Sequence, residues 1–213
     1  MKMKPLIIVI MVLSISGCSW YGYKDPSNHH FHRVNNYSNA YTLGVQNFTT
    51  NETSQKRLNS VKEAFSDVQD IFLNNKKFEK IILSQSWVSS CDGETIEKTS
   101  GKELLSDLRA LSVKVSVYPK KPWQAIGLTD AINKRMAIDP SRIDLANKDE
   151  IIDSSLLINT TAHEVTHLIL DENNLIKYRD EGHGKKNCLK NDLASYRVGK
   201  AAQAVWIHDK LAK

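Results

Sequence analysis

Several features that would mark other classes of protein are scarce or absent in this chain of 213 residues. It has no basic run with interleaved aromatic side chains, although its formal net charge is +5, so nucleic acid is not an expected partner. The apolar run near its start, residues 6–13, is too short to span a membrane as a helix. Only three cysteines occur, at positions 18, 91 and 188, and their places in the chain suggest different uses.

The first 18 residues have the order of an export signal. Lys2 and Lys4 precede the apolar run, which leads into the small-residue sequence Ile15-Ser16-Gly17-Cys18. This ending resembles a bacterial lipobox. The resemblance implies that residues 1–17 are removed as a signal peptide and that the thiol of Cys18 is lipidated.

The expected location is therefore the bacterial cell envelope, with the protein anchored to a membrane by its N-terminal lipid. Ser19 stands where an aspartate would suggest retention in the inner membrane of an enterobacterial type of cell, so the outer membrane is favoured. Residues 18–50 are polar and lack sustained periodicity, which predicts a lipidated tether. Residues 51–213 are then expected to form one domain.

Residues 162–168 contain the pattern His-Glu-x-x-His within a stretch that is expected to be helical. Residues four apart lie on one face of a helix, so His163 and His167 can present both imidazoles to one metal ion. Glu164 projects beside that ion, where its carboxylate can take a proton from a water molecule. Such a short pattern also arises by chance on solvated helices, but the dense apolar residues around it predict burial, and buried polar side chains need partners. We therefore predict a site for one zinc ion.

The pattern resembles the zincin superfamily of zinc metallopeptidases. The resemblance implies an α+β, zincin-like fold, in which a short mixed or antiparallel sheet lies beside the motif helix. In zincins the strand before that helix often forms the sheet edge above the metal and pairs with an extended substrate. Residues 125–131 and 135–138 are the candidates here, although such an edge can also simply be covered by the tether.

A catalytic zinc site needs a third protein ligand and an open position. Gly182-His183-Gly184 resembles the element that supplies the third histidine in SprT/Spartan-like zincins, and His183 follows His167 by 16 positions. The alternative ligand is Asp192, because residues 191–196 loosely resemble the downstream helix of gluzincin-type peptidases. If His183 binds, Asp192 can instead accept a hydrogen bond from a ligand imidazole.

Asp180 and Glu181 remain further candidates for the third ligand, and a site without a third ligand is the other alternative. Tyr196 follows Asp192 by one helical turn, so its phenol can reach the site and donate to an oxyanion. An ordinary buried tyrosine is the alternative explanation.

Cys91 and Cys188 are expected to form a disulfide, because an exported protein pairs the cysteines that are not lipidated. The two residues are 97 positions apart, so the bond would close a long loop. It would also pin the segment that delivers the third metal ligand.

The remaining pattern predicts several helices and strands. Apolar spacing predicts an amphipathic helix at residues 52–73, and Ser100 with Glu103 fits a capping box before a helix through residue 111. A strand is expected within residues 78–87, and alternation predicts a half-buried strand from Val113 to Val117. Asp153 or Ser154 is expected to cap the motif helix, and a long C-terminal helix to end the chain.

The function these features favour is that of a membrane-anchored zinc metallopeptidase, a hydrolase of the cell envelope. Glu164 would be the general base, and the partner would be a peptide or protein substrate. The peptide bond as the target is implied by the zincin resemblance. The alternative is a non-catalytic envelope binding or assembly lipoprotein with a structural or vestigial zinc site, which a closed set of four ligands would favour.

Overall fold

A mixed sheet forms one part of the fold in the computed structural model, which describes residues 31–37, 40–44, 51–119, 125–148, 150–180 and 188–213. Within these ranges the five strands of the sheet follow the order β1-β2-β5-β7-β6. The β2–β5 and β5–β7 pairs are parallel, whereas β1 and β6 pair antiparallel at the two edges. The strands are β1 (Phe31–Arg33), β2 (Thr42–Gly44), β5 (Lys114–Pro119), β6 (Gly127–Asp130) and β7 (Arg135–Ile138).

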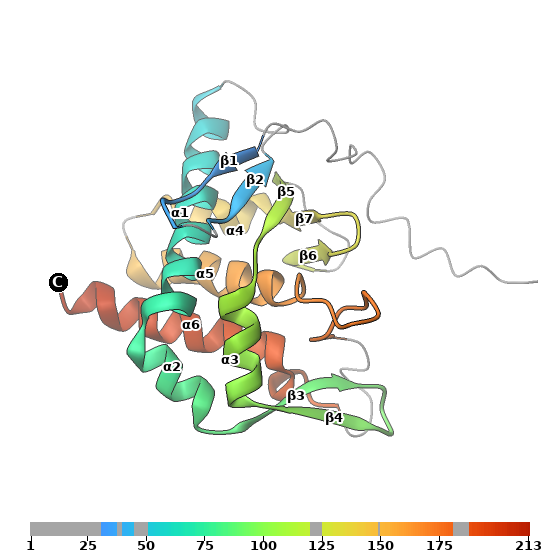
Figure 1. Cartoon of the computed structure of the whole chain (residues 1–213). Helices are drawn as coiled ribbons and strands as arrows, with labels where there is room; N and C mark the ends of the chain where they lie inside the picture. The colour runs from blue at the N-terminus through green and yellow to red at the C-terminus, as the bar shows by residue number, and fades with distance from the viewer. Residues whose placement is uncertain (1–30, 38–39, 45–50, 120–124, 149, 181–187) are drawn as a thin grey trace, which may run out of the picture.

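Helices make up the rest of the fold, together with a separate hairpin (Figure 1). The motif helix α5 packs along α6 and also contacts α1, so it lies in the middle of the molecule. The helices are α1 (Glu52–Asn74), α2 (Lys76–Leu83), α3 (Gly101–Ala110), α4 (Pro140–Leu145), α5 (Ile151–Thr166) and α6 (Ala194–Leu211). The hairpin consists of β3 (Ser86–Cys91) and β4 (Ile96–Ser100), and a short 3-10 helix, η3 (Lys190–Asp192), precedes α6. The mixed α+β class, the small mixed sheet and the long C-terminal helix are as the sequence predicts.

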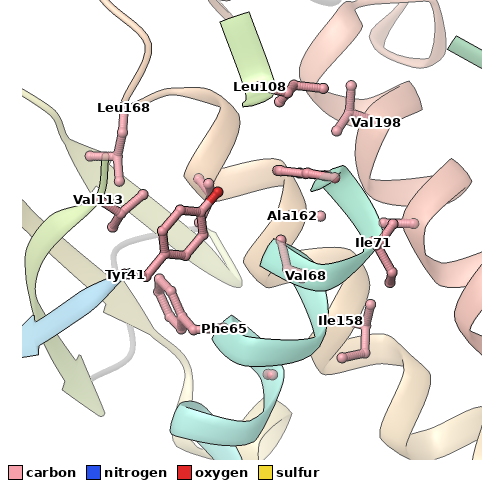
Figure 2. Packing of buried hydrophobic residues seen from close by; sticks show 14 of the residues in the cluster. Tyr41, Phe65, Val68, Ile71, Leu108, Val113, Ile158, Ala162, Leu168 and Val198 are labelled. Carbon is pink, nitrogen blue, oxygen red and sulfur yellow. The ribbon is translucent and has the colours of Figure 1, made fainter. Parts of the chain in front are cut away.

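The hydrophobic core fixes the motif helix in place. Figure 2 shows Phe65 and Val68 of α1 packed in the same cluster as Ile158 and Ala162 of α5. Fully burying a large apolar side chain contributes about 1.5–3 kcal/mol. Because the core surrounds α5, the helix that carries the motif has little freedom to tilt or shift.

Two predicted helix starts are confirmed by their caps. The side chain of Asn51 accepts a hydrogen bond from the Ser54 N–H at 2.9 Å and begins α1. The hydroxyl of Ser100 accepts from the Glu103 N–H at 3.1 Å and begins α3. Each cap satisfies a backbone donor that the first helical turn leaves without a partner.

The strand expected within residues 78–87 is wrong over most of its length. The Asn75 side chain accepts hydrogen bonds from the Lys77 and Phe78 N–H groups, which caps a helix at this point. Phe78 and Ile82 then lie four residues apart on the buried face of α2. The strand of this region, β3, begins only at Ser86.

Two other local expectations also need correction. The strand at residues 113–117 is not half-buried, because β5 lies between β2 and β7 and its Ser116 and Tyr118 side chains are buried as well. The motif helix begins at Ile151, so Asp153 and Ser154 lie inside its first turn and do not cap it.

Part of the expected tether belongs to the sheet. Residues 42–44 form β2, which pairs with β5, and Leu43 is fully buried. Strand β1 pairs with β2 in turn. The proposed signal peptide and Cys18 lie outside the described residues. Among the helices that are described, none combines the length and apolar character needed to cross a membrane.

Candidate metal centre

The C-terminal end of α5 brings the two motif histidines together. His163 lies in the last turn of the helix and His167 is its C-cap, with its N–H donating to carbonyls of the preceding turn. Their Nε2 atoms are 3.3 Å apart, and both side chains are buried. The four-residue spacing therefore places the two imidazoles side by side, as the sequence predicts.

A tight turn after α5 reverses the chain. The Asp171 carboxylate accepts hydrogen bonds from the N–H groups of Asn173 and Leu175, and Asn174 adopts a left-handed backbone with φ of 59°. Further along, the Lys177 N–H donates to the Ile169 carbonyl at 2.9 Å. The returning chain is thereby brought back over the motif histidines.

Asp180 is the residue that this reversal delivers to the histidines. Its Oδ2 atom lies 3.0 Å from Nε2 of His163 and 3.2 Å from Nε2 of His167. Ligand atoms about 2.0 Å from a tetrahedral zinc ion would be separated by about 3.3 Å. The three atoms thus have nearly the mutual spacing of three ligands, and this group could hold a metal ion.

The hydrogen bonding of His167 supports a cation at this point. Its Nδ1 atom lies 2.6 Å from the Tyr178 carbonyl oxygen, which can only accept, so Nδ1 carries a hydrogen. In the neutral ring Nε2 then presents a lone pair toward the Asp180 carboxylate. A proton or a metal ion must lie between them to prevent repulsion, so the donor set fits a metal.

The electrostatics of the group without metal agree with this conclusion. Burial alone would lower the pKa of His167, but the Asp180 carboxylate, the Glu164 charge and the Tyr178 carbonyl outweigh it and raise that pKa to about 9. Burial would raise the pKa of Asp180, but hydrogen bonds from His163 and His167 hold it well below its usual range. The group therefore attracts positive charge.

Glu164 lies beside this group of candidate ligands and is positioned by strand β6. The Thr129 hydroxyl is 2.8 Å from Oε2 of Glu164, while Oε1 lies 3.8 Å from Nε2 of His163. Gly127 makes this approach possible, because a Cβ atom there would lie only 2.4 Å from Oε1. The sequence motifs do not single out Gly127 and Thr129, although a glycine inside a strand can mark a close approach.

Tyr196 enters the site from α6, whereas Asp192 lies in η3, so the two residues do not share a helix as the sequence suggested. The ring centroid of Tyr196 is 4.4 Å from that of His163, and Tyr196 lines the same pocket. Burial, followed by the charge of Asp180 and a hydrogen bond with its carboxylate, raises the pKa of Tyr196, so the phenol stays protonated. Gly199 lets α6 pack this closely, since a Cβ atom there would lie 2.8 Å from the Asn159 carbonyl oxygen.

The expected third ligands have different places. His183 lies outside the described residues, so its role stays a prediction. Asp192 lies in η3 with an exposed side chain and is not part of the group formed by the two histidines and Asp180. The hydroxyl of Ser195 donates to Oδ1 of Asp180 and orients its carboxylate. The turn residues after α5 are the sequence signal that could have favoured Asp180.

The disulfide between Cys91 and Cys188 is present, as expected. It joins β3 to the segment that leads into η3 and α6. Leu193 packs against both cysteines and forms a parallel bridge with Val88. The wall of the site that carries Tyr196 is therefore tied to the hairpin.

The site opens into a pocket of about 850 Å³ between β6, α5 and α6. Ile126, Leu128 and Ile176 supply apolar lining, and the motif histidines lie on its wall. No family model, curated protein or solved structure matches the chain. The geometry of the site and the sequence motifs are therefore what indicate a function.

Proposed function

We propose that this protein is a zinc-dependent metallopeptidase of the bacterial cell envelope. The observation that carries the proposal is the convergence of His163, His167 and Asp180 at separations of 3.0–3.3 Å with the Glu164 carboxylate beside them. Two imidazoles and one carboxylate are a ligand set suited to catalytic zinc. When bound, zinc supplies a Lewis acid that polarises a carbonyl and lowers the pKa of water.

Glu164 is the proposed general base. The Thr129 hydroxyl donates a hydrogen bond to Oε2 of Glu164. Oε1, which lies on the side of the histidines, is therefore the atom proposed to take a proton from the attacking water. The same carboxyl group can pass this proton to the nitrogen of the leaving amine. Tyr196 is placed to donate its phenolic hydrogen to the oxyanion that develops on the peptide carbonyl.

Strand β6 is the proposed binding surface for the substrate backbone. It ends the sheet among the described strands, and the consecutive residues 125–129 line the pocket. A strand edge offers N–H and C=O groups that can pair with an extended peptide regardless of its sequence. This placement suits a peptidase and matches the role that the zincin resemblance implies.

Anchoring by a lipid on Cys18 remains part of the proposal. Its support is the order of charged, apolar and small residues before that cysteine. The Cys91–Cys188 disulfide is compatible with an oxidising compartment outside the cytoplasm.

The test combines metal content with cleavage by the full chain, purified in detergent without a metal-binding tag. Elemental mass spectrometry should find about one zinc per chain, as expected for one group of three ligands. Glu164→Gln should keep the zinc and lose about 100-fold to 10,000-fold in the cleavage rate of a peptide library. Equal cleavage by the variant would show that Glu164 is not the base.

Two other outcomes would overturn the peptidase proposal. A folded protein that takes up no zinc from excess metal would reduce the motif to a coincidence. Zinc binding with no cleavage of any library peptide would support the alternative, an envelope binding or assembly lipoprotein with a structural or vestigial site.

A further inference from the structure

The pocket above the candidate ligands is lined by four cationic side chains from different parts of the chain. Arg142 comes from α4, Arg179 precedes Asp180, Lys190 lies in η3 and Lys200 in α6. The carboxylates in the lining are Glu164 and Asp180, and both are already engaged with Thr129 and the histidines. A bound divalent metal would add further positive charge.

None of these four cations forms a salt bridge with a carboxylate among the residues that the structure describes. The Arg179 Nε–H donates to the Ile176 carbonyl, Lys190 lies over the Tyr196 ring, and Lys200 donates to the Asn191 side chain. Some cations outside the pocket are paired with carboxylates. Arg57, for example, forms two hydrogen bonds with Asp144, at 2.6 and 2.7 Å.

Arg142 is the most informative of the four. Its side chain is half-buried, and the nearby carboxylate of Asp139 already accepts hydrogen bonds from the N–H and hydroxyl of Ser141. Burial lowers the pKa of Arg142 and the Asp139 charge opposes this change. A partly buried guanidinium at the wall of a pocket is stabilised by a carboxylate that enters the pocket, because it can bind that carboxylate with two parallel hydrogen bonds.

We propose that the pocket selects peptides by a carboxylate group near the bond to be cleaved, with Arg142 as a specific contact. The exposed Lys190 and Lys200 side chains would attract the same charge from the pocket rim. This inference rests on the proposed function and names the chemical class of its substrate. The carboxylate can belong to an acidic side chain or to the C-terminus of the peptide.

The test measures binding in the metal-loaded Glu164→Gln full chain in detergent, in which cleavage is suppressed. Labelled peptides of one backbone sequence carry Glu, Gln or Lys at each position in turn, and end in a free carboxylate or an amide. We expect one of two results. Either the peptide with Glu at one position binds at least about tenfold more tightly than the peptide with Gln there, or the peptide with a free C-terminal carboxylate binds that much more tightly than its amide. The first result identifies a side chain as the source, and the second identifies the C-terminus.

Substitutions then locate the preference. Arg142→Gln should remove most of the preference for the carboxylate, and Arg142→Lys should retain part of it. Lys200→Gln should reduce the preference by a smaller factor, and added salt should abolish this smaller contribution. Lys102→Gln removes the same charge from an exposed position outside the pocket lining and should leave the preference unchanged. Because Lys200 is exposed, its variant stays informative if Arg142→Gln fails to fold.

The inference fails if Glu, Gln and Lys peptides bind equally at every position and the free carboxylate binds no more tightly than the amide. It also fails if the preference survives when Arg142 and Lys200 are both replaced by Gln. In either case Glu164-dependent cleavage by the wild-type chain would leave the peptidase proposal intact. A metal-loaded protein that neither binds nor cleaves any peptide would overturn both proposals together.

Discussion

The candidate ligands come from two regions that are positioned by different forces. His163 and His167 belong to the end of α5, which is enclosed by the apolar core. Asp180 belongs to an irregular segment that polar contacts hold against three other elements. Tyr178 donates to Asp107 of α3, the Arg179 N–H donates to Ser89 of β3, and Ser195 of α6 donates to Asp180 itself.

This difference indicates how each region responds to change. A helix buried among many apolar contacts keeps its position when one distant contact is altered, because the other contacts still hold it, even though the change costs stability. A segment held by a few hydrogen bonds and a cross-link depends on each of them. The site should therefore be more easily disturbed from the side of Asp180 than from the side of α5.

The largest expected effect concerns the disulfide that ties down this second region. Replacing Cys91 and Cys188 together by serine opens a loop of 97 residues, so the free energy of unfolding should fall by about 2–5 kcal/mol. Denaturant unfolding of the full chain in detergent measures the loss, with the reduced wild-type chain as the matched control. A decrease below about 1 kcal/mol would show that the polar contacts alone hold the segment.

The next effect tests Asp180 as the third ligand. Asp180→Asn keeps the shape of the side chain but removes the charge. Loss of a residue that only hydrogen-bonds to a metal ligand lowers metal affinity by about 10–100-fold, and we expect the loss of Asp180 to lower zinc affinity by more than this. Competition with a chelator of known affinity measures it. Asp192→Asn, an equal change in η3, should leave the affinity unchanged.

His183→Asn provides the contrary outcome. If this variant or Asp192→Asn lost the zinc while Asp180→Asn kept it, the third ligand would lie outside the group seen here. The segment that carries this other ligand would then be the second region of the site.

The smallest effect concerns pH and couples the two regions. The Asp180 carboxylate raises the pKa of His167 to about 9 in the metal-free protein, so a proton occupies Nε2 below that pH and must leave when metal binds. Zinc affinity should therefore rise with pH, by about tenfold per unit from this group between pH 7 and 8. Calorimetry in buffers of different ionisation enthalpy counts the released protons. Asp180→Asn should make the dependence shallower, and an unchanged slope would contradict the coupling.

Much of the first region could be predicted from the sequence. The spacing of His163 and His167 determines that they share a helix face, and the apolar residues between and around them determine that this face is buried. The helices α1 and α3, the strands β6 and β7, the C-terminal helix and the disulfide also follow from local patterns. These features depend on residues close in the chain or on simple pairing rules.

The second region shows where local patterns stop being sufficient. Asp180, Glu181, His183 and Asp192 are all polar residues downstream of the motif, and nothing in their own neighbourhood ranks them decisively. The turn at residues 171–174 brings Asp180 to the histidines, while η3 leaves Asp192 exposed. The short helix α2 is a different case, because its signal is local: Asn75 caps the helix, and the apolar residues after it are also compatible with a strand.

The sequence by itself determined that a buried helix carries two histidines and a glutamate, because side-chain direction on a helix follows from position alone. Only the tertiary structure decided which carboxylate completes the group, that Gly127 and Thr129 position Glu164, and that Arg142 and three other cations line the pocket. Each of these contacts joins residues far apart in the chain. Their distances depend on how whole elements pack, and no local pattern of residues encodes that packing.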